Sequence, residues 1–247
     1  MRHLKKAVCI LIAAALVVCF AFALVACNNN AKPETMTDAD FEALYSFANA
    51  TSNSQSYRNV TTFVTHTADG DVTEQETCGI YTNNTSRTIT IDTVLTAADG
   101  TVTKTYYIYG LYQGRTVEAE AEFVGDAELP SSSTYSNTSS SAESQVIAKS
   151  SALRAVNDII NLKNYDIISA TVINYGDGKY DYEISYGTND SGQANASIVA
   201  HVENEKLISA TVTQGDVSYT ATYEFNVGSK TVPSKPDWFK QYPAPED

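Results

Sequence analysis

Alternating runs of apolar and polar residues, separated by short polar turns, constrain the fold of this chain more than any other feature. Asp69-Gly70 and Asp99-Gly100 each stand between two such runs. Asp-Gly between alternating runs is a strong signal for a β-hairpin. Similar runs follow residue 164, and the 16 tyrosines of the chain also favour strands. The predicted strands are one from Tyr57 to the turn at Ala68, then 72–82, 86–96, 101–113, 115–124, 165–175, 179–186, 193–202, 206–214 and 217–227.

Two segments have the apolar spacing of helices instead. Thr37 can cap a helix, and Asp40 places an acid three positions later, which is the capping-box arrangement. The residues that follow predict a helix of about fourteen residues, and residues 143–161 predict a second helix with one apolar stripe. The expected fold is therefore α+β: a single curved antiparallel sheet of about 9–11 strands, a half-open barrel, covered by two helices.

The compositional changes along the chain suggest one domain with irregular flanks. The curved-sheet domain is expected at residues 37–233. Residues 125–142 are rich in serine and longer than an ordinary connection, so we expect a mobile loop there. Residues 234–247 form a proline-rich tail that holds the only tryptophan, Trp238.

The N-terminal segment has the order of parts found in a secretory signal. A basic start is followed by an apolar run that ends in Leu24, Val25 and Ala26, directly before Cys27. This ending resembles the lipobox of bacterial lipoproteins. The resemblance implies that residues 1–26 are a lipoprotein signal peptide, that Cys27 receives a diacylglyceryl group on its thiol, and that residues 27–36 are a tether. An uncleaved transmembrane helix is the alternative, because the apolar run has about the twenty residues needed to span a bilayer.

Either interpretation places the domain outside the cytoplasm, attached to a bacterial membrane at the cell surface or facing the periplasm. The chain has a formal net charge of −13, and removal of Arg2, Lys5 and Lys6 with the signal would make it −16. This charge argues against nucleic acid as a partner. Cys78 is the only cysteine left in the domain, so we expect no internal disulfide.

Residues that could perform catalysis or bind metal are sparse. Glu118, Glu120 and Glu122 share one strand face and could form a carboxylate pair for hydrolysis, but a solvated outer face is the simpler interpretation. His66 and His201 are far apart in the sequence, and a metal site needs three or four converging ligands. We therefore predict no catalytic residue, no metal site and no cofactor, with an envelope hydrolase as a weaker alternative.

Small residues recur at strand positions that are expected to point inward. They would leave space above the sheet, which either a closely packed helix or an apolar ligand could fill. The candidate groove residues are Ala119, Ala121, Ala170, Ala196 and Ala210. A separate set of aromatic residues could stack on a sugar, or could simply cover the sheet: Tyr106, Tyr107, Tyr109 and Tyr112.

The order of elements resembles one known family. A helix, five strands, a polar loop, a second helix and closing strands that include Tyr219–Phe225 and Val227, with Thr231-Val232-Pro233 behind them, are similar to the lipoprotein-carrier fold, the LolA/LolB-like and LppX-type proteins. The resemblance implies an incomplete barrel, plugged by helices, that holds acyl chains. The expected function is a membrane-anchored, non-catalytic protein that binds a lipid or acyl chain between sheet and helix. The alternative is a cell-envelope protein that binds cell-wall glycan or a protein partner through a tyrosine-rich sheet face.

Overall fold

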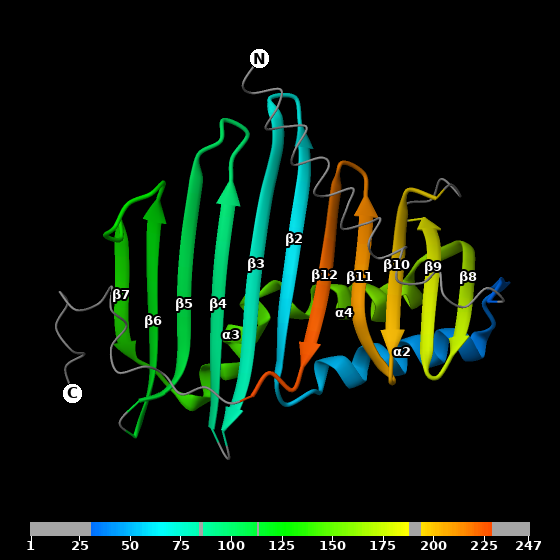
Figure 1. The fold of residues 1–247 in the computed structure, drawn as a ribbon, viewed down its shortest axis with the longest axis horizontal. Helices are drawn as coiled ribbons and strands as arrows, with labels where there is room; N and C mark the ends of the chain where they lie inside the picture. The colour runs from blue at the N-terminus through cyan, green and yellow to red at the C-terminus, as the bar shows by residue number, and fades with distance from the viewer. Residues whose placement is uncertain (1–30, 84–85, 113, 188–193, 229–247) are drawn as a thin grey trace.

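The computed structural model describes residues 31–83, 86–112, 114–187 and 194–228, and these residues form one open antiparallel sheet of twelve strands (Figure 1). The order across the sheet is β1-β8-β9-β10-β11-β12-β2-β3-β4-β5-β6-β7. The strands are β1 (Pro33–Thr35), β2 (Tyr57–Thr67), β3 (Gly70–Asn83), β4 (Ser86–Thr96), β5 (Val102–Tyr112), β6 (Arg115–Val124), β7 (Ser132–Asn137), β8 (Asp166–Gly176), β9 (Lys179–Gly187), β10 (Ala196–Glu203), β11 (Lys206–Gln214) and β12 (Val217–Phe225).

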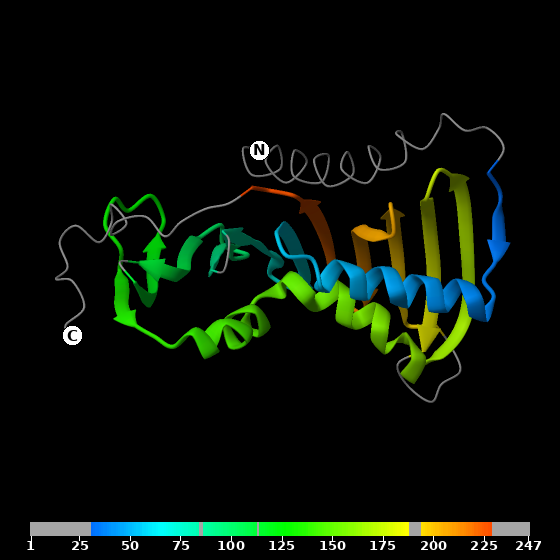
Figure 2. The same ribbon diagram turned by 90° about the horizontal axis from the view of Figure 1, so that it is seen from below.

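All the described helices lie on one side of the curved sheet (Figure 2). The α-helices are α2 (Asp38–Ser52), α3 (Glu143–Lys149) and α4 (Arg154–Asn161), and short 3-10 turns flank the last two: η1 (Ser140–Ala142), η2 (Ser151–Leu153) and η3 (Leu162–Asn164). The upper ends of β2 to β5 in Figure 1, which include the two Asp-Gly turns, extend beyond the helices. The predicted α+β class, with one curved antiparallel sheet covered by helices, is confirmed.

Helix α2 begins where the sequence pattern predicts. The backbone N–H of Thr37 donates to a carboxylate oxygen of Asp40 at 2.7 Å, which satisfies one N–H group at the helix start. Leu44, Ala48 and Thr51 form its buried side. The Thr51 hydroxyl accepts a hydrogen bond from the backbone N–H of Leu207 at 2.8 Å, so the end of α2 is fixed to strand β11.

The second predicted helix is broken near its middle. Ser150 has an extended backbone, with ψ of 159°, and this separates α3 from η2 and α4. Its hydroxyl donates to the carbonyl oxygen of Ile147 at 2.8 Å and accepts from the N–H of Ala152 at 3.3 Å. Serine commonly forms such local bonds at helix ends. Residues 143–161 are therefore largely helical, as predicted, but they form two short α-helices instead of one continuous helix.

The strand count exceeds the predicted 9–11 because both sheet edges carry a short extra strand. Pro33 to Thr35 pair with β8, so part of the predicted tether belongs to the sheet. Residues 132–137, inside the predicted serine-rich mobile loop, pair with β6 as β7. Neither segment, Pro-Glu-Thr or Ser-Ser-Thr-Tyr-Ser-Asn, has an apolar alternation that would reveal a strand. The predicted signal peptide, Cys27 and the tail at 234–247 lie outside the described residues.

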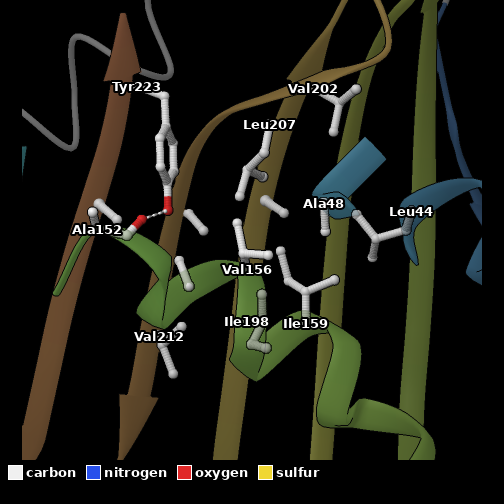
Figure 3. Packing of buried hydrophobic residues seen from close by; sticks show 14 of the residues in the cluster. Leu44, Ala48, Ala152, Val156, Ile159, Ile198, Val202, Leu207, Val212 and Tyr223 are labelled. Atoms are coloured by element: carbon white, nitrogen blue, oxygen red, sulfur yellow. Dashed lines mark hydrogen bonds between the residues drawn. The ribbon is translucent and has the colours of Figure 1, made fainter. Parts of the chain in front are cut away.

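The main core lies between α2, α4 and the strands from β9 to β12 (Figure 3). Leu44 and Ile159 from the helices and Ile198 and Leu207 from the sheet are each fully buried. Within the described ranges, no helix is both long enough and apolar enough to cross a membrane.

Candidate ligand-binding face

The strand register divides the side chains of the sheet between two faces, because residues directly opposite each other on paired strands point the same way. Tyr223 bonds to the backbone of Ala152 in η2, and this identifies the helix-facing face. The opposite side is called the outer face here. One row of paired residues on the helix-facing face runs from β12 to β6 through Tyr219, Phe63, Glu74, Leu95, Thr103 and Val124.

The predicted groove alanines do not gather in one place. Ala170, Ala196 and Ala210 lie on the helix-facing face, as expected. Ala119 and Ala121 are buried, as predicted, but they lie on the outer face, away from the helices that were expected to cover them. Their cross-strand neighbours include Ile108 and Tyr106, and both alanines are fully buried.

Helix side chains fill the space above the remaining alanines. Ala196 and Ala210 belong to the same core cluster as Leu44, Ala48 and Ile159, and Figure 3 shows these helix residues directed at the sheet. Of the two expected fillers of this space, the structure supports the close-packed helix. The space above Ala196 and Ala210 is therefore occupied by helix side chains.

The glutamate row of β6 lies on the helix-facing face, and its central residue, Glu120, is exposed to solvent, as the simpler interpretation expects. The Tyr107 hydroxyl donates to Glu118 at 3.0 Å, and Ser136 donates to the same carboxylate at 3.4 Å. Ser131 donates to Glu122 at 3.2 Å. Burial, followed by the bond to Glu118, raises the pKa of Tyr107 above its ordinary value. Two of these three acids therefore form structural hydrogen bonds to their neighbours.

The four tyrosines of β5 do not form a single binding platform. Tyr107 and Tyr109 lie on the helix-facing face and Tyr106 on the outer face. Tyr109 is buried, and its hydroxyl donates to the carbonyl oxygens of Ser139 and Ser140, at 3.2 Å each. Tyr106 packs edge-on against Phe123, with 5.6 Å between ring centres. Tyr112 is half-buried and shares the outer face with Tyr106.

The two histidines bind separate acids. His66 lies 2.8 Å from Asp71 at the exposed β2–β3 turn. His201, on the outer face, lies 2.5 Å from Asp181 and 3.3 Å from Glu203. Ser209 is the cross-strand partner of His201, but within the described residues the His201 ring bonds only to these two acids. Nor do the described His, Cys, Asp and Glu side chains form a group of three or more that could hold a metal ion.

Cys78 is fully buried on the helix-facing face, and burial raises the pKa of its thiol to about 12. The protonated thiol, which is not the reactive form, is therefore favoured at neutral pH. Cys78 acts here as a small apolar side chain, which explains why it is buried in the core.

An exposed apolar strip occupies the part of the helix-facing face that the helices leave open. The strip consists of Phe63, Leu95, Val124 and Val217. Leu95 and Val217 are each 37% exposed and Val124 is 48% exposed. Leu95, Val124 and Val217 lie at or next to the ends of β4, β6 and β12, and Phe63 lies four residues before the end of β2. The sequence shows the alternation of apolar and polar residues in β4 and β6. It does not show which face of these strands the helices cover, so the strip could not be predicted from it.

One cation lies at the β12–β2 end of the strip. The guanidinium carbon of Arg154, at the start of α4, is 5.0 Å from the ring centre of Phe63 and 5.1 Å from that of Tyr219. Tyr219 in turn donates a hydrogen bond to Asp158, one helical turn later. An open apolar surface therefore ends beside a positively charged group.

No protein-family model matches this chain, and no curated protein matches it. Among solved structures, it is similar to the Mycobacterium tuberculosis lipoprotein LppX, at 11% identity and a TM-score of 0.37, over 79% of this chain and 100% of LppX. LprF from Mycobacterium bovis has 11% identity and a TM-score of 0.38, over 81% and 97% of the two chains. A β-barrel-like protein of unknown function from Brucella abortus has 12% identity and a TM-score of 0.30, over 70% and 97%. Likeness at this level does not carry a ligand over to this chain.

Proposed function

We propose that this protein is an extracytoplasmic lipoprotein that binds a lipid or acyl chain without catalysing a reaction. The observation that carries the proposal is the exposed apolar strip on the helix-facing face. Three of its side chains are more than a third exposed although they share this face with the core. Apolar groups in such a position lower the free energy when an acyl chain covers them, by roughly 0.8 kcal/mol per buried CH₂.

The shape of the strip suits an extended chain better than a compact ligand. Its residues come from β12, β2, β4 and β6, which span five strand spacings, or about 24 Å at the usual separation of neighbouring strands. Thr103 and Glu74 lie between them in the same row. A flexible apolar chain can pass along the raised hydrophobic side chains while these polar groups remain in water.

The proposed anchor would hold this strip near lipid. In this proposal Cys27 carries the acyl groups, and the first strand begins at Pro33. The six residues of separation can span at most about 20 Å. The sheet would therefore remain within one domain diameter of the membrane surface, where lipid is available.

Binding of a fluorescent long-chain fatty acid to the soluble domain would test the ligand. Replacement of Leu95 or Val124 with glutamine should weaken binding about tenfold or more, because each places a polar group under the acyl chain. Val199→Gln is the matched control, since Val199 is 43% exposed but lies on the outer face. No binding by the wild-type domain, or equal weakening by the control, would refute the proposal.

The anchor has its own test. Cells that express the full chain should incorporate radiolabelled palmitate into it, and Cys27→Ser should abolish the label. A labelled Cys27→Ser chain, or a wild-type chain without label, would contradict lipidation at this residue. Neither result depends on the ligand-binding measurement.

A further inference from the structure

The guanidinium of Arg154 stacks on two aromatic rings and has no ion-pair partner among the described residues. Within the described residues the guanidinium forms neither a salt bridge nor a hydrogen bond, and it lies over the rings of Phe63 and Tyr219. These two rings are themselves tilted together, with centres 5.3 Å apart. Stacking on two rings orients the planar group and limits the entropy that it would lose on binding an anion.

A guanidinium recognises carboxylates and phosphates in particular. It has five N–H donors in a fixed plane, which match two oxygen atoms of either anion. Asp158 lies one helical turn away, but its carboxylate accepts the hydroxyl of Tyr219 instead of pairing with Arg154. The N–H donors of Arg154 therefore remain available for an anionic group of a ligand.

The charges along the strip define how an amphipathic molecule would be oriented. Phe63 is the residue of the strip that comes from β2, and the guanidinium of Arg154 lies over its ring. Glu74 lies between Phe63 and Leu95, and Glu122 neighbours Val124 on the same face of β6. These acids repel an anionic group farther along the strip, so the anion is favoured at Arg154.

We infer that the ligand is a single-chain amphiphile with a carboxylate or phosphate head, bound with the head at Arg154 and the chain along the strip toward Val124. This inference rests on the proposed lipid-binding function and specifies the class of head group. A lipid of this class would come from a free fatty acid or from a monoacyl phospholipid, which share an anionic head on one apolar chain.

Binding of three probes with the same sixteen-carbon chain to the wild-type domain tests the inference: palmitate, hexadecyl phosphate and hexadecanol. The wild-type domain should bind the two anions about tenfold more tightly than the alcohol, since charge-assisted bonds to the guanidinium are available only to the anions. Added salt should reduce this preference. The relative affinity of palmitate and hexadecyl phosphate distinguishes the two lipid sources.

Arg154→Gln should remove most of the preference for anions while the affinity for hexadecanol stays the same, and Arg154→Lys should retain part of it. Leu95→Gln should weaken all three probes together. Wild-type binding of all three probes with equal affinity would overturn the head-group assignment and leave lipid binding itself supported. Equal weakening of all three by Arg154→Gln would also overturn it, because the residue would then act only by packing on Phe63 and Tyr219. If none of the three probes binds to the wild-type domain, the proposed function itself is refuted.

Discussion

Tyr223 donates its hydroxyl hydrogen to the carbonyl oxygen of Ala152 at 3.0 Å and so joins the last strand of the sheet to the turn before helix α4 (Figure 3). Tyr223 is 5% exposed and Ala152 is fully buried. Glu76 and Tyr219 add further bonds from the sheet to the same helical segment, through Ser151 and Asp158. Polar side chains of the sheet therefore fix the position of α4, and with it the position of Arg154.

Tyr223→Phe should lower the free energy of unfolding by about 1–3 kcal/mol, because the buried carbonyl of Ala152 loses its donor. Chemical denaturation of the soluble domain measures the change. Tyr165→Phe is the control, since Tyr165 is 40% exposed, and it should alter stability by less than about 0.5 kcal/mol. Equal effects of the two substitutions would show that the Tyr223 hydroxyl does not stabilise the helix attachment.

Ile159→Ala should lower the free energy of unfolding by about 2–5 kcal/mol, since Ile159 is fully buried between α4 and the sheet and alanine would leave a cavity. Leu129→Ala removes a similar side chain that is 62% exposed and should have little effect. Urea titration of both variants gives the comparison. A small loss of unfolding free energy for Ile159→Ala would contradict the prediction, because it would mean that the helices shift toward the sheet and fill the cavity.

The sequence alone predicts most of the architecture because its signals are local. Asp69-Gly70 ends β2 and starts the hairpin return, and Thr37 with Asp40 begins α2. Both depend on residues a few positions apart. The alternation on either side of Asp99-Gly100 likewise yields the paired strands β4 and β5.

The errors concern properties that depend on the whole sheet. Val117, Ala119 and Ala121 alternate with three glutamates, and the pattern alone favours an apolar inner face. These three apolar residues are buried, but the register places them on the outer face and places Glu120 opposite Tyr107 on the helix-facing side, near the sheet edge. No local pattern states how far the helices reach across the sheet, so neither the exposure of Leu95 nor the position of Arg154 above Phe63 could be predicted.

Glu76→Gln should change how stability depends on pH. Burial raises the pKa of the Glu76 carboxyl above its ordinary value of 4.5, although hydrogen bonds from Ser151 oppose the shift. The folded state then binds a proton more readily than the unfolded state, so the contribution of Glu76 to the free energy of unfolding falls as pH rises from that value through the folded-state pKa. The wild-type protein should therefore lose stability relative to Glu76→Gln across this interval.

Denaturation at a series of pH values from about 4 to about 7 measures this difference. Glu120→Gln, in an exposed part of β6, controls for the loss of one negative charge. A difference between wild type and Glu76→Gln that stays constant with pH would show that Glu76 titrates alike in the folded and unfolded states.

His201→Gln should destabilise the protein more in mild acid than in base. The hydrogen bond to Asp181 is the main cause that raises the pKa of His201 above its ordinary value of 6.5; burial opposes it, and Glu203 adds to the increase. A raised pKa means that the imidazolium stabilises the folded state. This stabilisation is complete below the ordinary pKa and is lost as pH rises through the folded-state pKa. The loss of unfolding free energy in His201→Gln should therefore be larger at about pH 5.5 than at about pH 9.

NMR titration of the ring protons should place the midpoint for His201 above 6.5. A midpoint below that value would contradict the ionic contact between β9 and β10, whereas His66→Gln, at an exposed turn, should leave this midpoint unchanged.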